Sequence, residues 1–382
     1  MKIFIVAGAR PNFMKIAPLL REIIKGSDNL CPIIIHTGQH YDYNMSDSFF
    51  IDLNIARPDY FLGIGSGTHA EQTAKIMIEF EKVLRKEQPE ILLVVGDVNS
   101  TLACALVASK TVYTNTDNMN ISFVRRYKRP VIVHVEAGLR SFDRTMPEEI
   151  NRIITDSLSD MLFTSESIAN DNLRQEGIGK EKIYYVGNVM IDALEMMKDK
   201  IEQCPIIDEI GLNNTDYGVL TMHRPSNVDN TGILKDIVQK LLEISERITL
   251  VFPVHPRTRK NLDETGLFKS LMAGNRILIL DPLPYKDFMK LMFNSKFAIT
   301  DSGGLQEETT YLGIPCLTLR PNTERPVTVS QGTNLLVNLD NLVGMVDQIL
   351  NGKWKKGIIP EYWDGQTAQR IVSILHAQTG KL

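Results

Sequence analysis

The chain of 382 residues is long enough for two domains of ordinary size. Its hydrophobic content of 43% and charged content of 23% are typical of globular proteins, and no apolar stretch is long enough to cross a bilayer. A net charge of −4 argues against nucleic acid as a partner, because phosphate backbones are held by clustered Lys and Arg. We therefore expect a soluble protein with no nucleic-acid and no membrane partner.

The N-terminal apolar run ends abruptly at Arg10 without a cleavable stretch, which predicts a buried first strand and not an export signal. Four cysteines lie far apart in or beside apolar segments, so neither a zinc site nor a disulfide framework is indicated. Both features favour a cytoplasmic protein. The cysteines are Cys31, Cys104, Cys204 and Cys316.

Short runs rich in Val and Ile alternate with helical patterns through the first half of the chain. Residues 71–86, for example, place their apolar side chains on one helical stripe. Continuous apolar strands separated by helices predict a parallel sheet covered on both faces. The expected strands are residues 3–7, 32–37, 91–96, 131–135, 161–164 and 183–186.

The same alternation begins again after residue 187. Residues 367–377 then form a helix with one apolar side, expected to pack back on the first domain. The expected strands of the second half are residues 218–222, 249–254, 276–280, 297–300 and 316–319. The pattern predicts an α/β fold of two doubly wound, Rossmann-like domains, residues 1–186 and 187–366, with helix 367–382 on the first.

Ligands of open α/β sheets bind beyond the carboxyl ends of the strands, so we expect the two sheets to face a cleft lined by strand-end loops. One segment breaks the pattern: residues 111–129 are polar and rich in Asn, which predicts a surface loop. Functional residues are therefore to be sought where strands end.

The first strand opens into the sequence Gly-Ala-Arg-Pro-Asn-Phe-Met-Lys, residues 8–15. Arg10 and Lys15 bring two cations to a helix N-terminus, where the helix dipole also favours anions, so a pyrophosphate would fit. The alternative is that both are ordinary solvated cations. Neither a G-x-G-x-x-G nor a P-loop motif is present, so nicotinamide and P-loop binding lack their usual support.

Carboxylates follow two of the expected strands. Asp97 could act in catalysis or simply cap the helix that follows. Glu136 comes directly after an apolar strand and must find a partner, for which Arg140 is a candidate. Glu148 and Glu149 follow a proline at an expected helix start, where acids are favoured whatever the function.

The second domain has histidines at two strand ends, His223 and His255, each of which would more often be structural. Its strongest signal is residues 300–308, Thr-Asp-Ser-Gly-Gly-Leu-Gln-Glu-Glu, in which a strand end leads through two glycines into a helix. Glycines let backbone N–H groups approach phosphate oxygens, and an acid one turn later can accept hydrogen bonds from ribose hydroxyls. This pattern indicates a nucleoside-diphosphate site, with an ordinary flexible helix start as the alternative.

Taken together, these motifs resemble the non-hydrolysing UDP-N-acetylglucosamine 2-epimerases, whose order they follow across nearly the whole chain. The matching segments are residues 8–11 with Lys15, 37–40, 96–97, 134–140, 147–152, 187–188, 223–224, 253–255, 301–308 and 323–326.

The resemblance implies a glycosyltransferase-B-like arrangement, with UDP bound mainly by the second domain, and a homodimer. The implied reaction is the reversible C2 epimerisation of UDP-GlcNAc to UDP-ManNAc without nicotinamide or metal, a step in polysaccharide biosynthesis. UDP is eliminated across C1–C2 to give a bound 2-acetamidoglucal and is added back after protonation of the opposite face.

By position, the family's catalytic groups fall on Asp97, Glu136, Glu148 and His223. Phe288 falls where the family packs near uracil, and His255 is an additional candidate. The positions that match contacts to UDP or its sugar are Arg10, Lys15, Ser302, Gly303, Gly304, Glu308 and Arg325.

This chain departs from the family pattern in three places. Asn12 and Phe13 replace the Glu and Ala of many members, for which we expect adjusted packing. Members activated by a second substrate molecule carry an arginine near residues 65–69; its absence argues against such activation despite Gln39 and His40. The third departure is the length of residues 111–129.

The nearest alternative is a sister epimerase acting on a UDP-diacetamido-uronic acid by the same mechanism. Those relatives place an aromatic residue where Arg325 stands, so this segment favours UDP-GlcNAc. A second alternative is a glycosyltransferase of the same fold, which would need an acceptor site. A two-domain solute-binding protein is the third, and it would normally carry an export signal.

Overall fold

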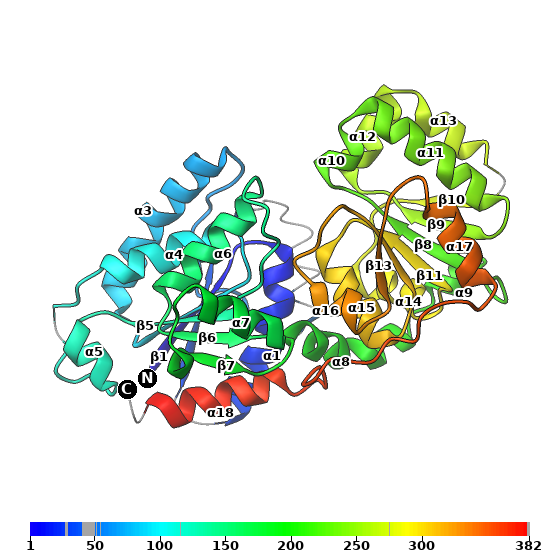
Figure 1. Ribbon diagram of the computed structural model, residues 1–382. Coiled ribbons are helices and arrows are strands. Elements are labelled where there is room, and N and C mark those ends of the chain that lie inside the picture. Colours follow the sequence, from blue (N-terminus) through cyan, green and yellow to red (C-terminus); the bar gives the residue numbers. More distant parts are fainter. Residues whose placement is uncertain are drawn as a thin grey trace. The chain divides into compact units, whose positions relative to one another are not determined.

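The computed structural model describes residues 1–26, 30–39, 50, 52–53, 55–114, 116–274 and 276–379. The chain divides into two compact units (Figure 1). Unit 1 comprises Met1–Met196 and Glu361–Leu382, and unit 2 comprises Met197–Pro360. Among the described residues, no helix is both long and apolar enough to span a membrane.

Unit 1 is built on a seven-stranded sheet, all of whose neighbouring strands pair in parallel, in the order β3-β2-β1-β4-β5-β6-β7. The side chains of β4 and β5 are buried throughout, as expected of central strands covered on both faces. The strands are β1 (Lys2–Ala7), β2 (Cys31–His36), β3 (Tyr60–Phe61), β4 (Ile91–Val95), β5 (Val131–Ala137), β6 (Met161–Thr164) and β7 (Ile183–Tyr185).

The helices of unit 1 cover this sheet. Helix α4 packs against α3 and α6, and α18 packs against α1 (Figure 1). The helices are α1 (Arg10–Gly26), α3 (His69–Glu87), α4 (Asn99–Lys110), α5 (Ser122–Tyr127), α6 (Pro147–Leu158), α7 (Ser167–Gln175), α8 (Val189–Glu202), the last turn of which enters unit 2, and α18 (Thr367–Thr379), with the 3-10 turn η1 (Lys180–Lys182) before β7.

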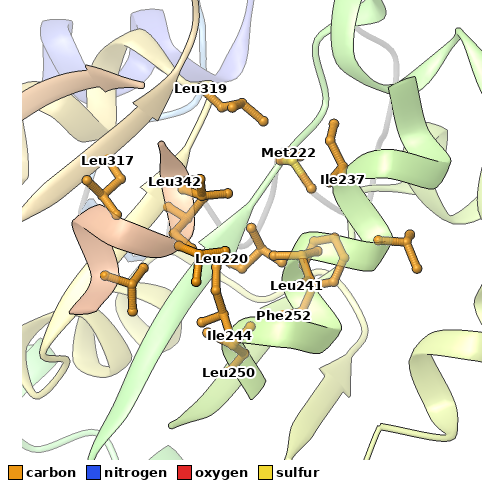
Figure 2. Close-up of a cluster of buried hydrophobic side chains, with 14 of the residues drawn as sticks. Leu220, Met222, Ile237, Leu241, Ile244, Leu250, Phe252, Leu317, Leu319 and Leu342 are labelled. Atoms are coloured by element: carbon orange, nitrogen blue, oxygen red, sulfur yellow. The ribbon is translucent and has the colours of Figure 1, made fainter. Parts of the chain in front are cut away.

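Unit 2 repeats this plan with a six-stranded parallel sheet in the order β10-β9-β8-β11-β12-β13. Figure 2 shows its core, in which Leu220 and Phe252 from the sheet meet Ile237 and Leu241 from helix α11. The strands are β8 (Tyr217–Thr221), β9 (Thr249–Pro253), β10 (Ile277–Leu280), β11 (Phe297–Thr300), β12 (Cys316–Leu319) and β13 (Asn334–Val337).

The helices of unit 2 are mostly short. Only α11 and α15 reach ten residues. The helices are α9 (Ile206–Glu209), α10 (Pro225–Val228), α11 (Thr231–Ser245), α12 (Pro256–Glu264), α13 (Leu267–Met272), α14 (Tyr285–Phe293), α15 (Gly303–Leu312), α16 (Pro326–Ser330) and α17 (Leu342–Leu350).

The prediction of two doubly wound, Rossmann-like α/β domains is confirmed, because both strand orders reverse direction beside the first strand of the unit. Every strand expected from the sequence is present within one or two residues. The strands β3 and β13 were not expected. Both are edge strands: β3 has only two residues, and β13 begins with a polar residue, Asn334, and is only partly buried along its length.

The unit boundaries fall at residues 196 and 360, where the sequence suggested 186 and 366. The start of α8 belongs with unit 1 because Asp192 accepts hydrogen bonds from the backbone N–H groups of Thr367 and Ala368, at 3.1 and 2.6 Å. The segment before α18 is tied to the same unit, since Trp363 Nε1 donates to the Ser165 carbonyl. These contacts decide the boundary.

The expectation of a surface loop for residues 111–129 is confirmed in part: many of the described residues are exposed, but the segment is not entirely a loop. Apart from Asn115, which lies outside the described residues, the segment contains α5 and buries Tyr113 and Val124. The Tyr113 hydroxyl donates to the Pro89 carbonyl at 2.9 Å, and the Glu90 carboxylate accepts from the Ile121 N–H at 2.8 Å. Two contacts to the start of β4 therefore hold the segment against the unit.

Replacing Asp192 with Ala should lower the free energy of unfolding by about 0.5–2 kcal/mol, the cost of removing a side-chain cap from a helix start. Urea unfolding measures this loss. Asp199→Ala is the matched control, because Asp199 is an exposed residue of the same helix. Equal stabilities of the two variants would contradict the capping role.

Candidate active site

The carboxylate of Glu136 is buried at the carboxyl end of β5, with 6% of the residue exposed. Its backbone has a φ of +73°, and the pairing of β5 with β6 shifts register between Val135 and Ala137. The carboxylate forms an ion pair with the ammonium of Lys15, which is 7% exposed in α1. A non-glycine residue held in the left-handed region is strained, and such strain is concentrated at functional sites.

Asp97 follows β4, the neighbour of β5, so Asp97 and Glu136 lie at adjacent strand ends. The Asp97 carboxylate pairs with the guanidinium of Arg152 in α6. The alternative that Asp97 caps α4 is wrong, because Val98 is the N-cap residue and makes no side-chain cap hydrogen bond.

The two acids at the start of α6 have different environments. Glu149 is buried and accepts hydrogen bonds from the N–H groups of Ser141 and Phe142, at 3.0 and 2.8 Å, and from Arg152. Burial alone would raise the pKa of Glu149, but these bonds outweigh it and lower the pKa. Glu148 is half-buried, and in the described part of the chain its carboxylate makes no hydrogen bond or ion pair. A ligand could therefore engage Glu148.

A buried polar network underlies these carboxylates. Asp156 pairs with Arg140, so the suggested pairing of Arg140 with Glu136 is wrong. His134 Nδ1 lies 2.6 Å from Asp156 Oδ1, and His134 Nε2 lies 2.8 Å from the Gly96 carbonyl oxygen. Each ring nitrogen of His134 therefore faces an oxygen atom, so the ring is held from both sides. Burial would raise the pKa of Asp156, but the charges of His134 and Arg140 hold it below its usual value.

Asn12, one of the departures from the family pattern, connects two strand ends. Its Oδ1 accepts from the N–H groups of Gly8 and Ala9, at 3.0 and 2.9 Å, and its Nδ2 donates to the Val95 carbonyl at 3.2 Å. The asparagine therefore fixes the turn between β1 and α1 against β4. The loop that carries Arg10 is held by these three bonds.

Arg10 is the first residue of α1, and burial lowers its pKa while the charge of Asp52 opposes the shift. Gln39 is buried, and its Oε1 accepts from the Ser100 hydroxyl at 2.8 Å. His40 lies outside the described residues. Arg10 therefore places a candidate cation at the start of α1. Gln39, which follows β2, is held by its hydrogen bond with Ser100.

In unit 2 the buried Asp301 organises the strand ends. Its carboxylate accepts from the backbone N–H groups of His223 and Arg224, and lies 3.1 Å from His223 Nδ1. Burial would raise the pKa of Asp301, but the bond and charge of His223, together with the bonds from Arg224 and Asn227, outweigh burial and lower the pKa. The His255 ring lies beside His223, with 5.5 Å between ring centroids. His223 remains 41% exposed, so its ring is both oriented and accessible.

At the N-terminus of α15 no side chain caps the backbone N–H groups, and there is space beside Gly304. Ser302 is the N-cap residue without a side-chain cap bond, and a Cβ added at Gly304 would meet no atom within 4 Å. Gly303 has a different constraint, because a Cβ there would collide with the Glu324 carboxylate. Burial would raise the pKa of Glu324, but Arg325 and Arg320 outweigh it and lower that pKa to about 2. The helix dipole and uncapped N–H groups favour an anion here.

Two adjacent buried acids of α15 have different partners. Glu307 pairs with the Arg325 guanidinium, with 2.5 Å between Oε1 and Nε. Glu308 accepts from the Tyr285 hydroxyl at 2.6 Å. Burial and the Glu307 charge raise the pKa of Glu308 to about 7, although the Tyr285 bond acts in the opposite direction. Phe288 follows Tyr285 by three residues in α14, which places both on one helix face.

Comparison with known proteins gives a consistent result. A family model described as UDP-N-acetylglucosamine 2-epimerase matches residues 22–376. The UDP-N-acetylglucosamine 2-epimerase of Methanocaldococcus jannaschii is 45% identical over 384 residues, covering 98% of this chain and 99% of that protein. The chain belongs to the UDP-N-acetylglucosamine 2-epimerase family.

Two further comparisons are informative. A crystal structure of the M. jannaschii epimerase in complex with UDP-GlcNAc and UDP has a TM-score of 0.86 and 44% identity, covering 99% of this chain and all of that one. The UDP-2,3-diacetamido-2,3-dideoxy-D-glucuronate 2-epimerase of Pseudomonas aeruginosa is 40% identical over 381 residues, covering 98% of this chain and 99% of that protein. The predicted glycosyltransferase-B-like fold, built from two Rossmann-like domains, is the fold of these epimerase structures.

Several residues that organise the candidate groups of the two units were not among the sequence candidates. Asp301 could have been found from the sequence, because it is a charged residue directly after an apolar strand. Nothing in the sequence indicated the roles of Tyr285 and Asp156, because their partners are distant in the sequence. Among the described residues, no group of three or more His, Cys, Asp or Glu is arranged to hold a metal ion.

Replacing Lys15 with Met should lower the free energy of unfolding by about 3–5 kcal/mol, because it leaves the Glu136 carboxylate buried without its cation. The double variant Lys15→Met/Glu136→Gln should recover much of this loss. Urea unfolding of the single and double variants measures both values.

The matched control is Lys82→Met, which removes an exposed helical ion pair with Glu79 and should cost less than about 1 kcal/mol. A Lys15 variant as stable as the Lys82 variant would contradict the buried pairing.

Proposed function

We propose that the protein interconverts UDP-GlcNAc and UDP-ManNAc by elimination and re-addition of UDP. The observation that carries the proposal is the pair of carboxylates, Asp97 and Glu136, at adjacent strand ends, with one held by a buried cation and a strained backbone. Full-length similarity to UDP-N-acetylglucosamine 2-epimerases supports the same reaction.

The chemistry explains the need for several carboxylates. The C2 proton lies beside no carbonyl group and is barely acidic, so its removal must be coupled to departure of the glycosyl oxygen from C1. A base takes the C2 proton, the C2–H electron pair forms the C1=C2 bond, and UDP leaves with the electrons of the C1–O bond. Re-addition protonates C2 on the opposite face and re-forms the C1–O bond. Two faces need acid–base groups on two sides, for which Asp97, Glu136 and Glu148 are the candidates.

The departing UDP gathers negative charge that the site must stabilise. In this proposal the Ser302 hydroxyl and the N–H groups of Gly303 and Gly304 bind the diphosphate, which the α15 dipole favours. The Ser302 N–H already donates to the Thr300 hydroxyl at 2.9 Å. Arg10 and the accessible ring of His223 add positive charge or donors.

The remaining candidates bind other parts of the substrate. Glu308 accepts the ribose hydroxyls, and Phe288 packs near uracil. Lys15 and Arg325 already pair with Glu136 and Glu307, so they act by holding those carboxylates as well as by their charge.

A second candidate function is the C2 epimerisation of a UDP-diacetamido-uronic acid. The observation in its favour is 40% identity with the P. aeruginosa enzyme over almost the full length of both chains. The two functions share one mechanism and differ in the sugar, so product analysis with each substrate separates them.

We also propose a cellular location, an oligomeric state and a biosynthetic role for the enzyme. We place it as a cytoplasmic homodimer that supplies polysaccharide biosynthesis. Light scattering on the purified protein tests the dimer.

In deuterated water, purified protein without added nicotinamide should convert UDP-GlcNAc to a mixture with UDP-ManNAc that carries deuterium at C2, because C2 is reprotonated from solvent. Proton NMR follows both the new sugar and the loss of the C2 proton signal. Product without solvent deuterium would exclude this elimination mechanism.

Asp97→Asn should slow turnover at least about a hundredfold by removing an acid–base group. The same NMR assay measures the turnover of the variant.

Affinity for UDP-GlcNAc should rise with pH up to about 7 and then level off. Glu308 has a raised pKa of about 7 in the free protein, so below that pH it is protonated and must lose a proton to accept both ribose hydroxyls. UDP-GlcNAc suits this test because its phosphates do not titrate in the range. Isothermal titration calorimetry at several pH values measures the profile, which Glu308→Gln should flatten. An equally steep profile in that variant would reject the assignment.

A further inference from the structure

Phe142 combines two features that are unfavourable for a folded chain. It lies in the loop between β5 and α6 with a backbone φ of +59°, and 77% of the residue is exposed. Bulky side chains rarely adopt the left-handed region, and a large aromatic ring left in water gains no burial energy. Neither feature stabilises the unit.

The other non-glycine residues with a positive φ, apart from Glu136, have a local explanation. Gln88 and Lys128 are helix C-caps, where the left-handed conformation ends the helix. Asn214 is of a residue type that tolerates this region. Tyr362 packs its ring against Tyr185, with 4.9 Å between centroids. In the described part of the chain, Phe142 has no aromatic or cation–π partner.

The conformation of Phe142 is imposed by the network of the candidate active site. Glu149 accepts the Phe142 N–H at 2.8 Å and the Ser141 N–H at 3.0 Å. The same carboxylate is bound by Arg152, whose guanidinium also pairs with Asp97. Phe142 is therefore linked through Glu149 and Arg152 to the candidate catalytic carboxylate of Asp97, and it lies six residues after Glu136.

We propose that Phe142 is a specificity-determining residue whose ring packs against the sugar of the UDP-sugar substrate, an inference that rests on the proposed function. A hexose presents C–H groups on one face, which fit an aromatic ring. The negative face of the ring disfavours a carboxylate. Phe142 therefore favours a neutral N-acetylhexosamine over a uronic acid at this position.

Phe142→Gly tests the proposal, because glycine adopts the observed φ without strain and removes only the ring. We expect an unchanged or higher melting temperature, and an affinity for UDP-GlcNAc about fivefold to tenfold weaker, as for the loss of one aromatic contact. Affinity for UDP, which lacks the sugar, should not change. Calorimetric titration with the two ligands gives both values.

Tyr362→Gly is the matched control, since it removes an aromatic ring at the same backbone conformation where the ring has a packing partner. It should lower the melting temperature and leave both affinities unchanged. Unchanged binding of UDP-GlcNAc by Phe142→Gly, or an equal loss for UDP, would overturn the proposal. Conversion to a smaller oligomer would assign the ring to a contact with a second copy and would also overturn it.

The outcome is separable from that of the proposed function. Wild-type protein that binds UDP-GlcNAc without converting it would reject the epimerase reaction, while the difference between UDP-GlcNAc and UDP binding would still decide the role of Phe142. In either case the role of Phe142 is decided by the change that Phe142→Gly makes in the affinity for UDP-GlcNAc relative to that for UDP.

Discussion

Burial of the Glu136 carboxylate is the constraint on which the candidate site of unit 1 depends. A carboxylate with 6% exposure is tolerated only beside a compensating charge, which Lys15 supplies. The backbone adapts to this pair: Glu136 has a positive φ, β5 shifts register, and Gly96 leaves room for Lys15 Nζ, which would lie 2.9 Å from a Cβ there. Three segments, the end of β5, helix α1 and the turn after β4, thus meet at this ion pair.

The hydrogen-bonded network around Asp156 gives this arrangement a rigid base. His134, Gly138 and Arg140 all bind its carboxylate, so the charge is fully compensated inside the unit. Above this base, Glu148 is half-buried and makes no ion pair within the described residues. The Asp156 carboxylate is thus held in place by its partners, whereas the Glu148 carboxylate is available to a ligand.

In unit 2 the charges differ in arrangement, and the feature that favours an anion is the N-terminus of α15. Asp301 accepts from backbone N–H groups of the segment that follows β8 and orients His223, while Glu324 and Glu307 neutralise buried arginines. The N-terminus of α15 keeps its N–H groups without a side-chain cap. Its donors therefore remain for a ligand, which agrees with a role in holding a diphosphate.

The sequence by itself determined the two α/β sheets, because strands buried on both faces are continuous apolar runs that periodicity detects. It also singled out Asp97 and Glu136 at one edge of the first sheet and His223 and the glycine pair at one edge of the second, because residues that follow parallel strands lie at the same edge of their sheet. Only the tertiary structure decided the partners: Glu136 pairs with Lys15 and not with nearby Arg140, and Glu308 with Tyr285. The physical reason is that ion pairs and hydrogen bonds join residues that are distant in the chain, whereas hydrophobic periodicity records only which face of each element is buried.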